Sequence, residues 1–187
     1  MKKLSSLLIA TLSVFLAYGC ASVYSTTPAS AKLTIDKHLV ARNYCAADVL
    51  ISQAKLVACQ PISAACQPIL IATIVDIDNL EHSTTFGRVT SENLSTRFTQ
   101  AGFKVIEMKF SKSVYMKKDE GELVLTREIT SIARDHNVQA VVVGTYAKGY
   151  ECVYLNVKLV IPNSNIISAS FDYTIPYDDE IKTLINY

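Results

Sequence analysis

The stretch "PILIATIVDID", residues 68–78, decides the fold. Its almost continuous apolar run, residues 69–75, is typical of a strand that is buried on both faces, as the strands of α/β proteins are. Asp76, Asp78 and Asn79 follow at once and predict a turn. The stretch therefore predicts the centre of a sheet, and the segments on either side of it have to supply the helices that cover that sheet.

The segment after this strand has the pattern of a helix followed by a second strand. Thr84 or Thr85 is suited to cap the helix, and Gly102 stands where a helix C-terminal glycine belongs. The apolar-rich "FKVIEMKF", residues 103–110, predicts the next strand. Because such a crossover places its two strands in parallel, the domain is predicted to begin with a βαβ unit. The buried side of the helix is predicted to be Phe86, Val89, Leu94, Phe98 and Ala101.

A second helix and strand repeat this pattern. Thr126 is the predicted cap of the helix, and Glu128 lies in its first turn, where the helix dipole favours an anion. Asn137 is predicted to end the helix, and "QAVVVGTYA", residues 139–147, follows as a strand. The buried stripe of this helix is predicted to be Ile129, Ile132 and Ala133.

The last part of the chain changes to strands joined by short turns. Residues 153–160 and 166–173 predict an antiparallel meander, and residues 178–187 predict a short final helix. The predicted fold class is therefore α/β. A single domain over residues 33–187 has a mixed sheet that begins as βαβαβ and ends as a meander, with helices packed on it.

The segment before the first strand also predicts a helix. Apolar residues recur at steps of three and four over residues 33–58, and Pro61 would end the helix. The predicted inner face is Val40, Tyr44, Ala47, Leu50 or Ile51, Ala54 and Val57.

The N-terminus has the pattern of an exported lipoprotein. Lys2 and Lys3 precede an apolar run that is too short to cross a bilayer as a permanent helix, which is typical of a signal peptide. The run ends in "AYGC", where small residues precede Cys20 as in a bacterial lipobox, although Ala17 stands where Leu is usual. We expect residues 1–19 to be a signal peptide and Cys20 to be diacylated.

The sequence after Cys20 indicates how the domain is attached. Residues 20–32 are rich in Ser, Thr, Ala and Pro and predict a flexible tether between lipid and domain. Ala21 and Ser22 include no aspartate, which favours the outer membrane over the inner. Ordinary signal cleavage, after Gly19 or after residues 29–31, is the alternative to lipidation. The net charge of +1 shows no basic excess, so nucleic acid is not an expected partner.

Four further cysteines would reach an oxidising compartment, where disulfides persist. The repeated Cys-Gln-Pro-Ile suggests that Cys59 and Cys66 close a short loop, which would leave Cys45 and Cys152 as a long-range pair. Four cysteines allow three connectivities, and free thiols are the alternative. No CxxC pair or histidine spacing favours a metal site.

No stretch of the chain has the pattern of a catalytic or cofactor site. The sequence contains no GxSxG elbow, phosphate-binding glycine loop or HExxH motif, so neither an enzyme nor a bound cofactor is expected. The acidic "VDIDNLE" after the first strand lacks the turning glycine of a calcium loop. It is predicted to be a structural turn or, because open α/β sheets bind at the carboxyl ends of their strands, a contact for a partner.

Three stretches together resemble the FlgO family of exported lipoproteins. The family pattern "FVDxDNL…FGR…SE" is matched by residues 74–98, "GE…LSR" is approached by "GELVLTR" at residues 121–127, and "VVGTY" is complete at residues 142–146. Thr126 stands where Ser is commoner, and the cysteine-rich insert is a further departure. The signature residues are Asp76, Asp78, Asn79, Gly87, Arg88, Glu92, Gly144 and Tyr146.

The resemblance implies a non-enzymatic outer-membrane lipoprotein that is associated with flagella and needed for motility. Its partners would be membrane lipid, through Cys20, and other flagellar or envelope proteins, including a second copy of the chain. The candidate contact residues are Asp76, Asp78, Asn79, Glu81 and Arg88. The alternative is a periplasmic ligand-binding or envelope-assembly lipoprotein without a link to flagella.

Overall fold

The computed structural model describes residues 39–187, except residues 60–65, 81, 109–114, 118–122 and 126. The chain divides into two compact units, residues 1–34 and 35–187, and all described residues belong to the second. The predicted signal peptide, Cys20 and the predicted tether therefore lie outside the described residues.

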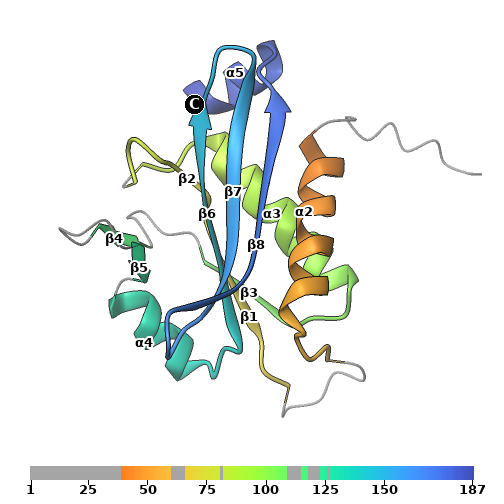
Figure 1. Cartoon of the computed structure of the whole chain (residues 1–187), viewed down its shortest axis with the longest axis vertical. Coiled ribbons are helices and arrows are strands. Elements are labelled where there is room, and N and C mark those ends of the chain that lie inside the picture. Colours follow the sequence, from red (N-terminus) through yellow and green to blue (C-terminus); the bar gives the residue numbers. More distant parts are fainter. Residues whose placement is uncertain (1–38, 60–65, 81, 109–114, 118–122, 126) are drawn as a thin grey trace, which may run out of the picture. The chain divides into compact units, whose positions relative to one another are not determined.

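The second unit alternates helices and strands and then forms a meander that is followed by a short final helix (Figure 1). Its elements are α2 (Leu39–Ala54), β1 (Ile69–Ala72), β2 (Val75–Asp76), α3 (Thr85–Gln100), β3 (Val105–Met108), β4 (Tyr115–Lys117), β5 (Leu123–Leu125), α4 (Arg127–Asp135), β6 (Ala140–Lys148), β7 (Cys152–Ile161), β8 (Ile166–Pro176) and α5 (Asp179–Asn186).

The predicted mixed sheet is confirmed. The strand order is β3-β1-β6-β7-β8, and β2 also pairs with β6. The strands β3, β1 and β6 run in parallel, as two successive βαβ crossovers require, whereas β7 and β8 add antiparallel strands. A separate pair, β4 and β5, forms a hairpin that the sequence did not predict.

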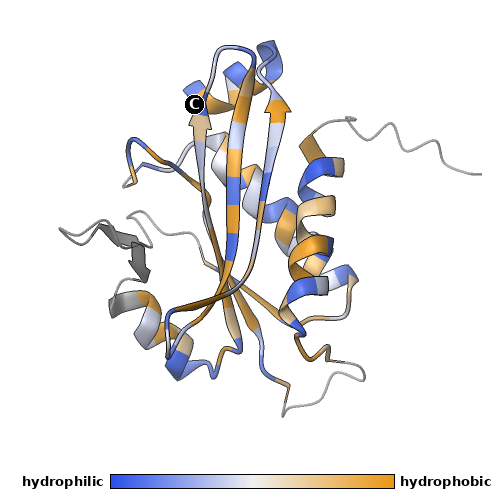
Figure 2. Cartoon of the chain, in the orientation of Figure 1, coloured by the Kyte–Doolittle hydropathy of each residue, from blue (hydrophilic) through white to orange (hydrophobic). Residues whose placement is uncertain are grey.

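Helices pack on both faces of this sheet. On one face α2, α3 and α5 enclose the larger core, in which Leu50, Phe86 and Phe98 are fully buried. On the other face α4 buries Ile129 against Leu70 of β1. The central strands are therefore apolar on both faces. Along β7, by contrast, hydrophilic and hydrophobic residues alternate, as Figure 2 shows.

The first strand is shorter than predicted. The run over residues 69–75 is buried as expected, but it divides into β1 and β2 at Thr73 and Ile74. The backbone N–H of Ile74 donates instead to Oγ of Ser91 on α3, at 3.0 Å. A side chain thus replaces a strand partner at this break, and β2 resumes pairing with β6 beyond it.

The first helix also differs from the prediction for residues 33–58. The described helix ends at Ala54, because Lys55 adopts a left-handed conformation with φ of 48°, and Pro61 is outside the described residues. Val57, predicted to be on the inner face, is 76% exposed. The residues that α2 does bury are Leu39, Asn43, Ala46, Ala47 and Leu50.

The remaining helices begin or end as predicted where they are described. Thr84 caps α3 by accepting from the N–H of Gly87, and Gly102 takes a positive φ of 89° just beyond that helix. Thr126 lies outside the described residues, and Asn137, with φ of 50°, follows α4. The meander and the final helix α5 are confirmed.

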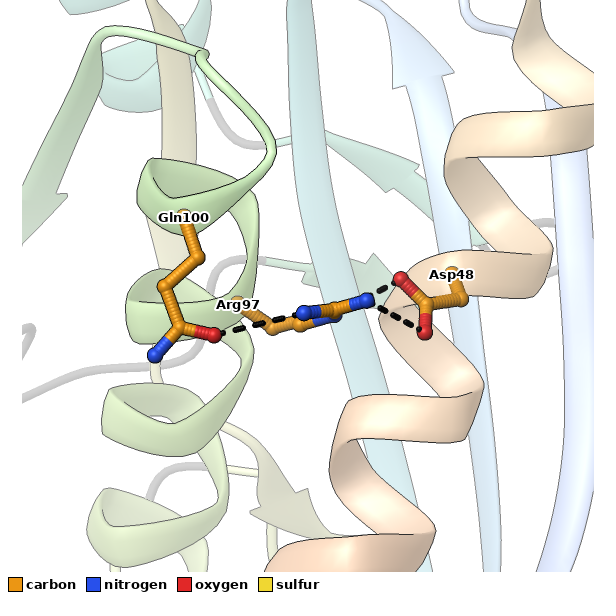
Figure 3. A network of polar contacts seen from close by, with 3 residues as sticks. All are labelled: Asp48, Arg97 and Gln100. Carbon is orange, nitrogen blue, oxygen red and sulfur yellow. Dashed lines mark hydrogen bonds and ion pairs between the residues drawn. The ribbon is translucent and has the colours of Figure 1, made fainter. Parts of the chain in front are cut away.

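An ion pair joins the two helices that lie on the same face (Figure 3). Arg97 of α3 donates from Nε to Oδ1 of Asp48 at 2.8 Å and from Nη2 to Oδ2 at 3.0 Å. Its remaining nitrogen, Nη1, donates to Oε1 of Gln100 at 3.3 Å. This paired geometry fixes α2 against α3 more specifically than a single surface contact would.

Candidate protein-contact site

The loop that follows β2, residues 77–82, is held in place by the carboxylate of Asp76, the last residue of that strand. Asp76 is only 7% exposed, and its Oδ1 accepts from the backbone N–H of Asp78 at 3.0 Å. Its Oδ2 lies 3.2 Å from Nζ of Lys148 at the end of β6. Asp76 therefore shapes the loop and anchors it to β6, and little of its side chain is left for a partner.

The following residues of this loop face solvent. Ile77 is 52% exposed, and Asp78 and Asn79 are also exposed. The N–H of Asn79 donates to the carbonyl of Asp76 at 3.2 Å, so the exposed residues sit on a hydrogen-bonded turn. Glu81 lies outside the described residues. The exposed candidates that the structure describes are thus Asp78 and Asn79, with Ile77 as an apolar neighbour that the sequence did not single out.

Arg88 supports the same region from the first turn of α3. Its Nη2 donates to Oγ1 of Thr85 at 2.8 Å, and its Nη1 donates to the carbonyl of Ser83 at 3.3 Å. Arg88 as a whole residue is half-buried. Arg88 therefore holds the entry into α3, next to the exposed turn, and does not extend freely from it.

Several signature residues pack α3 against the sheet. A Cβ on Gly87 would lie 1.9 Å from the carbonyl oxygen of Ile74, so only glycine allows the helix to approach the backbone at the β1–β2 break. Gly144 on β6 instead faces the neighbouring strand, where a Cβ would lie 2.5 Å from the carbonyl oxygen of Asn156 on β7. Glu92 is exposed on α3. The two glycines therefore serve the fold.

Tyr146 completes this packing from β6. Its side chain is 1% exposed, its ring meets Phe86 edge to face at 5.1 Å, and its hydroxyl lies 2.9 Å from Oγ1 of Thr84. Burial raises the pKa of Tyr146 above its ordinary value. Tyr146 thus links the helix cap to the central strand and is not exposed to a partner.

A groove of about 470 Å³ adjoins the exposed loop. We call it the meander groove, because it lies mainly over β6, β7 and β8. Sequence reasoning missed it, since it joins residues from four separate segments; the alternation along β7 was the only signal of an exposed face. The lining residues are Ile77, Thr145, Ala147, Tyr154, Leu155, Asn156, Asp172, Tyr173 and Thr174.

The structure pairs two of the predicted cysteines. Cys59 and Cys66 form a disulfide with their Cα atoms 5.6 Å apart. Cys45 is free and exposed, and Cys152 is free and half-buried, so the long-range pair suggested by the sequence is absent. The disulfide closes the short loop before β1 and leaves β7 without a covalent link to α2.

Metal ligands do not gather in the part of the chain that the structure describes. No group of three or more His, Cys, Asp or Glu side chains is placed to hold an ion there. His82 and His136 are exposed. No described helix combines the length and the apolar character needed to span a membrane.

These features define a small α/β domain whose mixed sheet carries helices on both faces and presents a polar loop beside an open groove. The chain belongs to the FlgO protein family, whose model matches residues 44–180. That match covers the sheet, the loop and the signature residues.

Comparison with solved structures gives similar proteins at low identity. The C-terminal domain of LpoB from Salmonella enterica has 13% identity and a TM-score of 0.46, over 74% of this chain and 96% of that chain. PelC from Paraburkholderia phytofirmans, a dodecamer, has 11% identity and a TM-score of 0.42, over 66% of this chain and 83% of that chain. The lipoprotein GNA1162 from Neisseria meningitidis has 15% identity and a TM-score of 0.39, over 61% of this chain and 85% of that chain. No curated protein matches the chain.

Proposed function

We propose that this protein is a non-enzymatic lipoprotein of the outer membrane that supports flagellar assembly and motility by contacting other envelope proteins. Membership of the FlgO family is the observation that carries the proposal. Diacylated Cys20 would hold the domain at the membrane, where acyl chains contribute about 0.8 kcal/mol per buried CH₂ and two chains anchor far better than one.

The exposed loop supports a role in protein contact. Asp78 and Asn79 lie on a turn that Asp76 and Lys148 fix to a rigid sheet. Polar residues held on such a loop are more often used for binding than for packing. Among the described residues we therefore assign the contact surface to Ile77, Asp78 and Asn79, and Asp76 and Arg88 to the support of that surface. Glu81, outside the described residues, stays a proposed contact.

Deletion of the gene, with complementation, tests the role in motility. We expect the deletion strain to swim poorly and to carry fewer flagella, and the wild-type chain to restore both. A strain that swims normally but has an envelope defect would favour an assembly role without a link to flagella. Normal swimming with normal flagellar number would overturn the flagellar proposal.

Two loop variants separate contact from fold. Asp78→Ala should leave the melting temperature nearly unchanged, because Asp78 uses its backbone N–H in the turn, yet should reduce the recovery of co-purifying envelope proteins. Asp76→Ala removes both the turn bond and the ion pair with Lys148, so it should lower the melting temperature as well. Unchanged recovery with Asp78→Ala would place the contact elsewhere.

Lipidation is tested at Cys20. Wild-type protein extracted from membranes should carry acyl chains on residue 20 in intact-mass spectra, and Cys20→Ser should release the chain from the outer membrane. An unmodified Cys20 at the mature N-terminus would exclude the anchor without affecting the assignment of the contact loop.

A further inference from the structure

The meander groove brings an aromatic ring and a carboxylate together on one face of the sheet. In the register of the meander, Tyr154 of β7 lies beside Ala147 and Thr174, and Asn156 lies beside Thr145 and Asp172. Tyr154 and Asp172 are therefore diagonal neighbours on adjacent strands, within reach of one side chain that bridges them.

Small residues leave the space between these two groups open. Ala147 and Thr145 of β6 form the floor beside Tyr154 and Asn156, and Ile77 of the exposed loop lines the groove next to them. The helices α2, α3 and α5 pack on the opposite face of the sheet. On the face that carries the groove, α4 packs further along the strands, against Val141, Val143 and Val160. No described helix therefore covers the groove.

The Tyr154 ring is both exposed and held in place. It is 57% exposed, and it leans on the β6–β7 turn so closely that a Cβ on Gly149 would lie 2.9 Å from its Cε2. A hydrogen bond with Cys152 raises the pKa of Tyr154 above its ordinary value. One edge of the ring is thus supported while most of its surface remains available for stacking.

Asp172 gives the groove its charge. It is the one charged residue among those that line the groove, and it is exposed. Its Oδ1 accepts from Nδ2 of Asn156 at 2.5 Å, which orients the carboxylate, and no described residue bonds to its Oδ2. The nearby cation Lys158 lies two pairs further along the strand, opposite Ser170, and does not line the groove.

We propose that the meander groove binds an arginine side chain presented by a partner protein. The guanidinium plane would stack on the Tyr154 ring, and its N–H groups would donate to the carboxylate of Asp172. Arginine fits better than lysine because its planar fork can stack and bond at the same time. Arg and Tyr are also among the residues that most often dominate the binding energy of protein interfaces.

This inference rests on the proposed function in one respect, namely that the arginine belongs to another envelope protein. The groove would then continue the contact surface of the exposed loop, since Ile77 belongs to both. The chemistry of the groove itself can be tested without knowledge of that partner.

The first test uses Nα-acetyl-arginine amide as the probe and the full chain, labelled with ¹⁵N, in detergent. We expect saturable shifts of the Thr145, Tyr154 and Asp172 amides with a dissociation constant of about millimolar, as is usual for a fragment of this size. The corresponding citrulline amide has nearly the same shape without the charge and should bind roughly tenfold more weakly. Equal binding of the two probes, or no saturable shift, would overturn the proposal.

Matched variants assign the effect to the groove. Asp172→Asn and Tyr154→Leu should each weaken binding of the arginine probe by roughly tenfold. Asp179→Asn, on the exposed start of α5, and Tyr150→Leu, 97% exposed beyond the groove, should leave it unchanged. Because Tyr154 and Asp172 are both exposed, circular dichroism should show the fold intact. Binding that survives both groove variants would overturn the assignment.

Motility and co-purification then separate this inference from the proposed function. Asp172→Lys, which reverses the charge, should reduce recovery of partner proteins and impair swimming as the gene deletion does. If deletion leaves swimming normal while the arginine probe still binds in the groove, the flagellar role fails and the groove stands. If deletion impairs swimming but the Asp172→Lys protein, expressed in the deletion strain, restores swimming fully, the flagellar role stands and the groove is not the contact.

Discussion

The hydroxyl of Tyr146 on β6 lies 2.9 Å from Oγ1 of Thr84, and both groups are buried. The same oxygen of Thr84 accepts from the N–H of Gly87 at 3.2 Å and so caps α3. One threonine therefore joins the start of the helix to the central strand. The signature residue Tyr146 thus forms a structural link beside Asp76, its neighbour on β2, after which the exposed loop begins.

This link predicts coupling between the two side chains. Tyr146→Phe should destabilise the domain by about 1 kcal/mol through the lost hydrogen bond, and Thr84→Ala by about 1–2 kcal/mol because it also removes the helix cap. Because both variants remove the same bond, the double variant should cost about 0.5–1 kcal/mol less than the two single costs combined. Urea unfolding of the four proteins measures this coupling.

Thr84→Ser provides the control, since it keeps the hydroxyl that caps the helix. It should lose much less stability than Thr84→Ala. Simple additivity of Tyr146→Phe and Thr84→Ala would mean that the two hydroxyls do not share a bond that matters for stability.

Among the signature residues, substitution of Gly87 is expected to cause the largest loss of folding stability. Gly87→Ala would place a methyl group 1.9 Å from the backbone oxygen of Ile74, where no side-chain rotation can relieve the clash. We expect a loss of about 1–3 kcal/mol or more, although alanine is normally the better helix former. Thr96→Ala, at an exposed position of the same helix, should be neutral by comparison. A fully stable Gly87→Ala protein would contradict the close approach of α3 to the β1–β2 break.

The sequence predicted the parts of this fold that depend on local periodicity. The apolar runs of β1 and β6 and the spacing of Thr84 and Gly102 around α3 led to the parallel βαβ units. The order of the strands in the sheet was not predicted, because two crossovers alone do not say on which side of β1 each new strand pairs. The division of the first strand could not be predicted, because the bond from Ile74 to Ser91 is a tertiary contact. The end of α2 was placed too late, because the helical periodicity of the sequence continues past Lys55, whose left-handed conformation ends the helix.

The candidate site was predicted only in part. The position after a strand end indicated a polar loop, and Asp78 and Asn79 are exposed there. Asp76 was included among the candidate contacts, but its carboxylate is buried and pairs with Lys148. That partner lies far along the chain and its position depends on the register of β6. The meander groove depends on the register of β7 and β8 as well, so Asp172 gave no sign of it in the sequence.

The edge of the sheet at β8 is covered by side chains of α2, which leads to a prediction about self-association. Two side chains of α2 bond to its outward backbone groups: Oε1 of Gln53 accepts from the N–H of Ser170 at 3.2 Å, and Nη1 of Arg42 donates to the carbonyl of Thr174. Covered edges resist pairing with another chain. The double variant Arg42→Ala with Gln53→Ala should therefore form dimers or larger species as its concentration rises.

Light scattering after gel filtration measures that association. Ser52→Ala is a matched control on the same helix, because its hydroxyl bonds to the carbonyl of Val49 within α2. It should behave as the wild-type chain does at every concentration. A double variant with an unchanged mass would show that Arg42 and Gln53 are not needed to protect the edge.

Tyr173 predicts a pH dependence of stability at the interface between α2 and β8. Its hydroxyl donates to Oδ1 of the buried Asn43 at 2.7 Å, and burial raises the pKa of Tyr173 above its ordinary value. In the unfolded chain the phenol ionises near pH 10, whereas in the folded chain it stays protonated to higher pH. The stability due to Tyr173 is therefore fully present below about pH 10 and declines as the pH rises above it.

Tyr173→Phe removes this titration and the hydrogen bond together. At pH 7 the variant should be less stable than the wild-type chain by about 1–2 kcal/mol, because the buried Oδ1 of Asn43 loses its donor. Above about pH 10 the difference should shrink, since only the wild-type chain loses stability by ionisation of this residue in its unfolded state. Urea unfolding of both proteins from pH 7 to about pH 11 gives the comparison. Other groups titrate in both proteins and cancel, so a difference that stays constant or widens with pH would contradict the raised pKa of Tyr173.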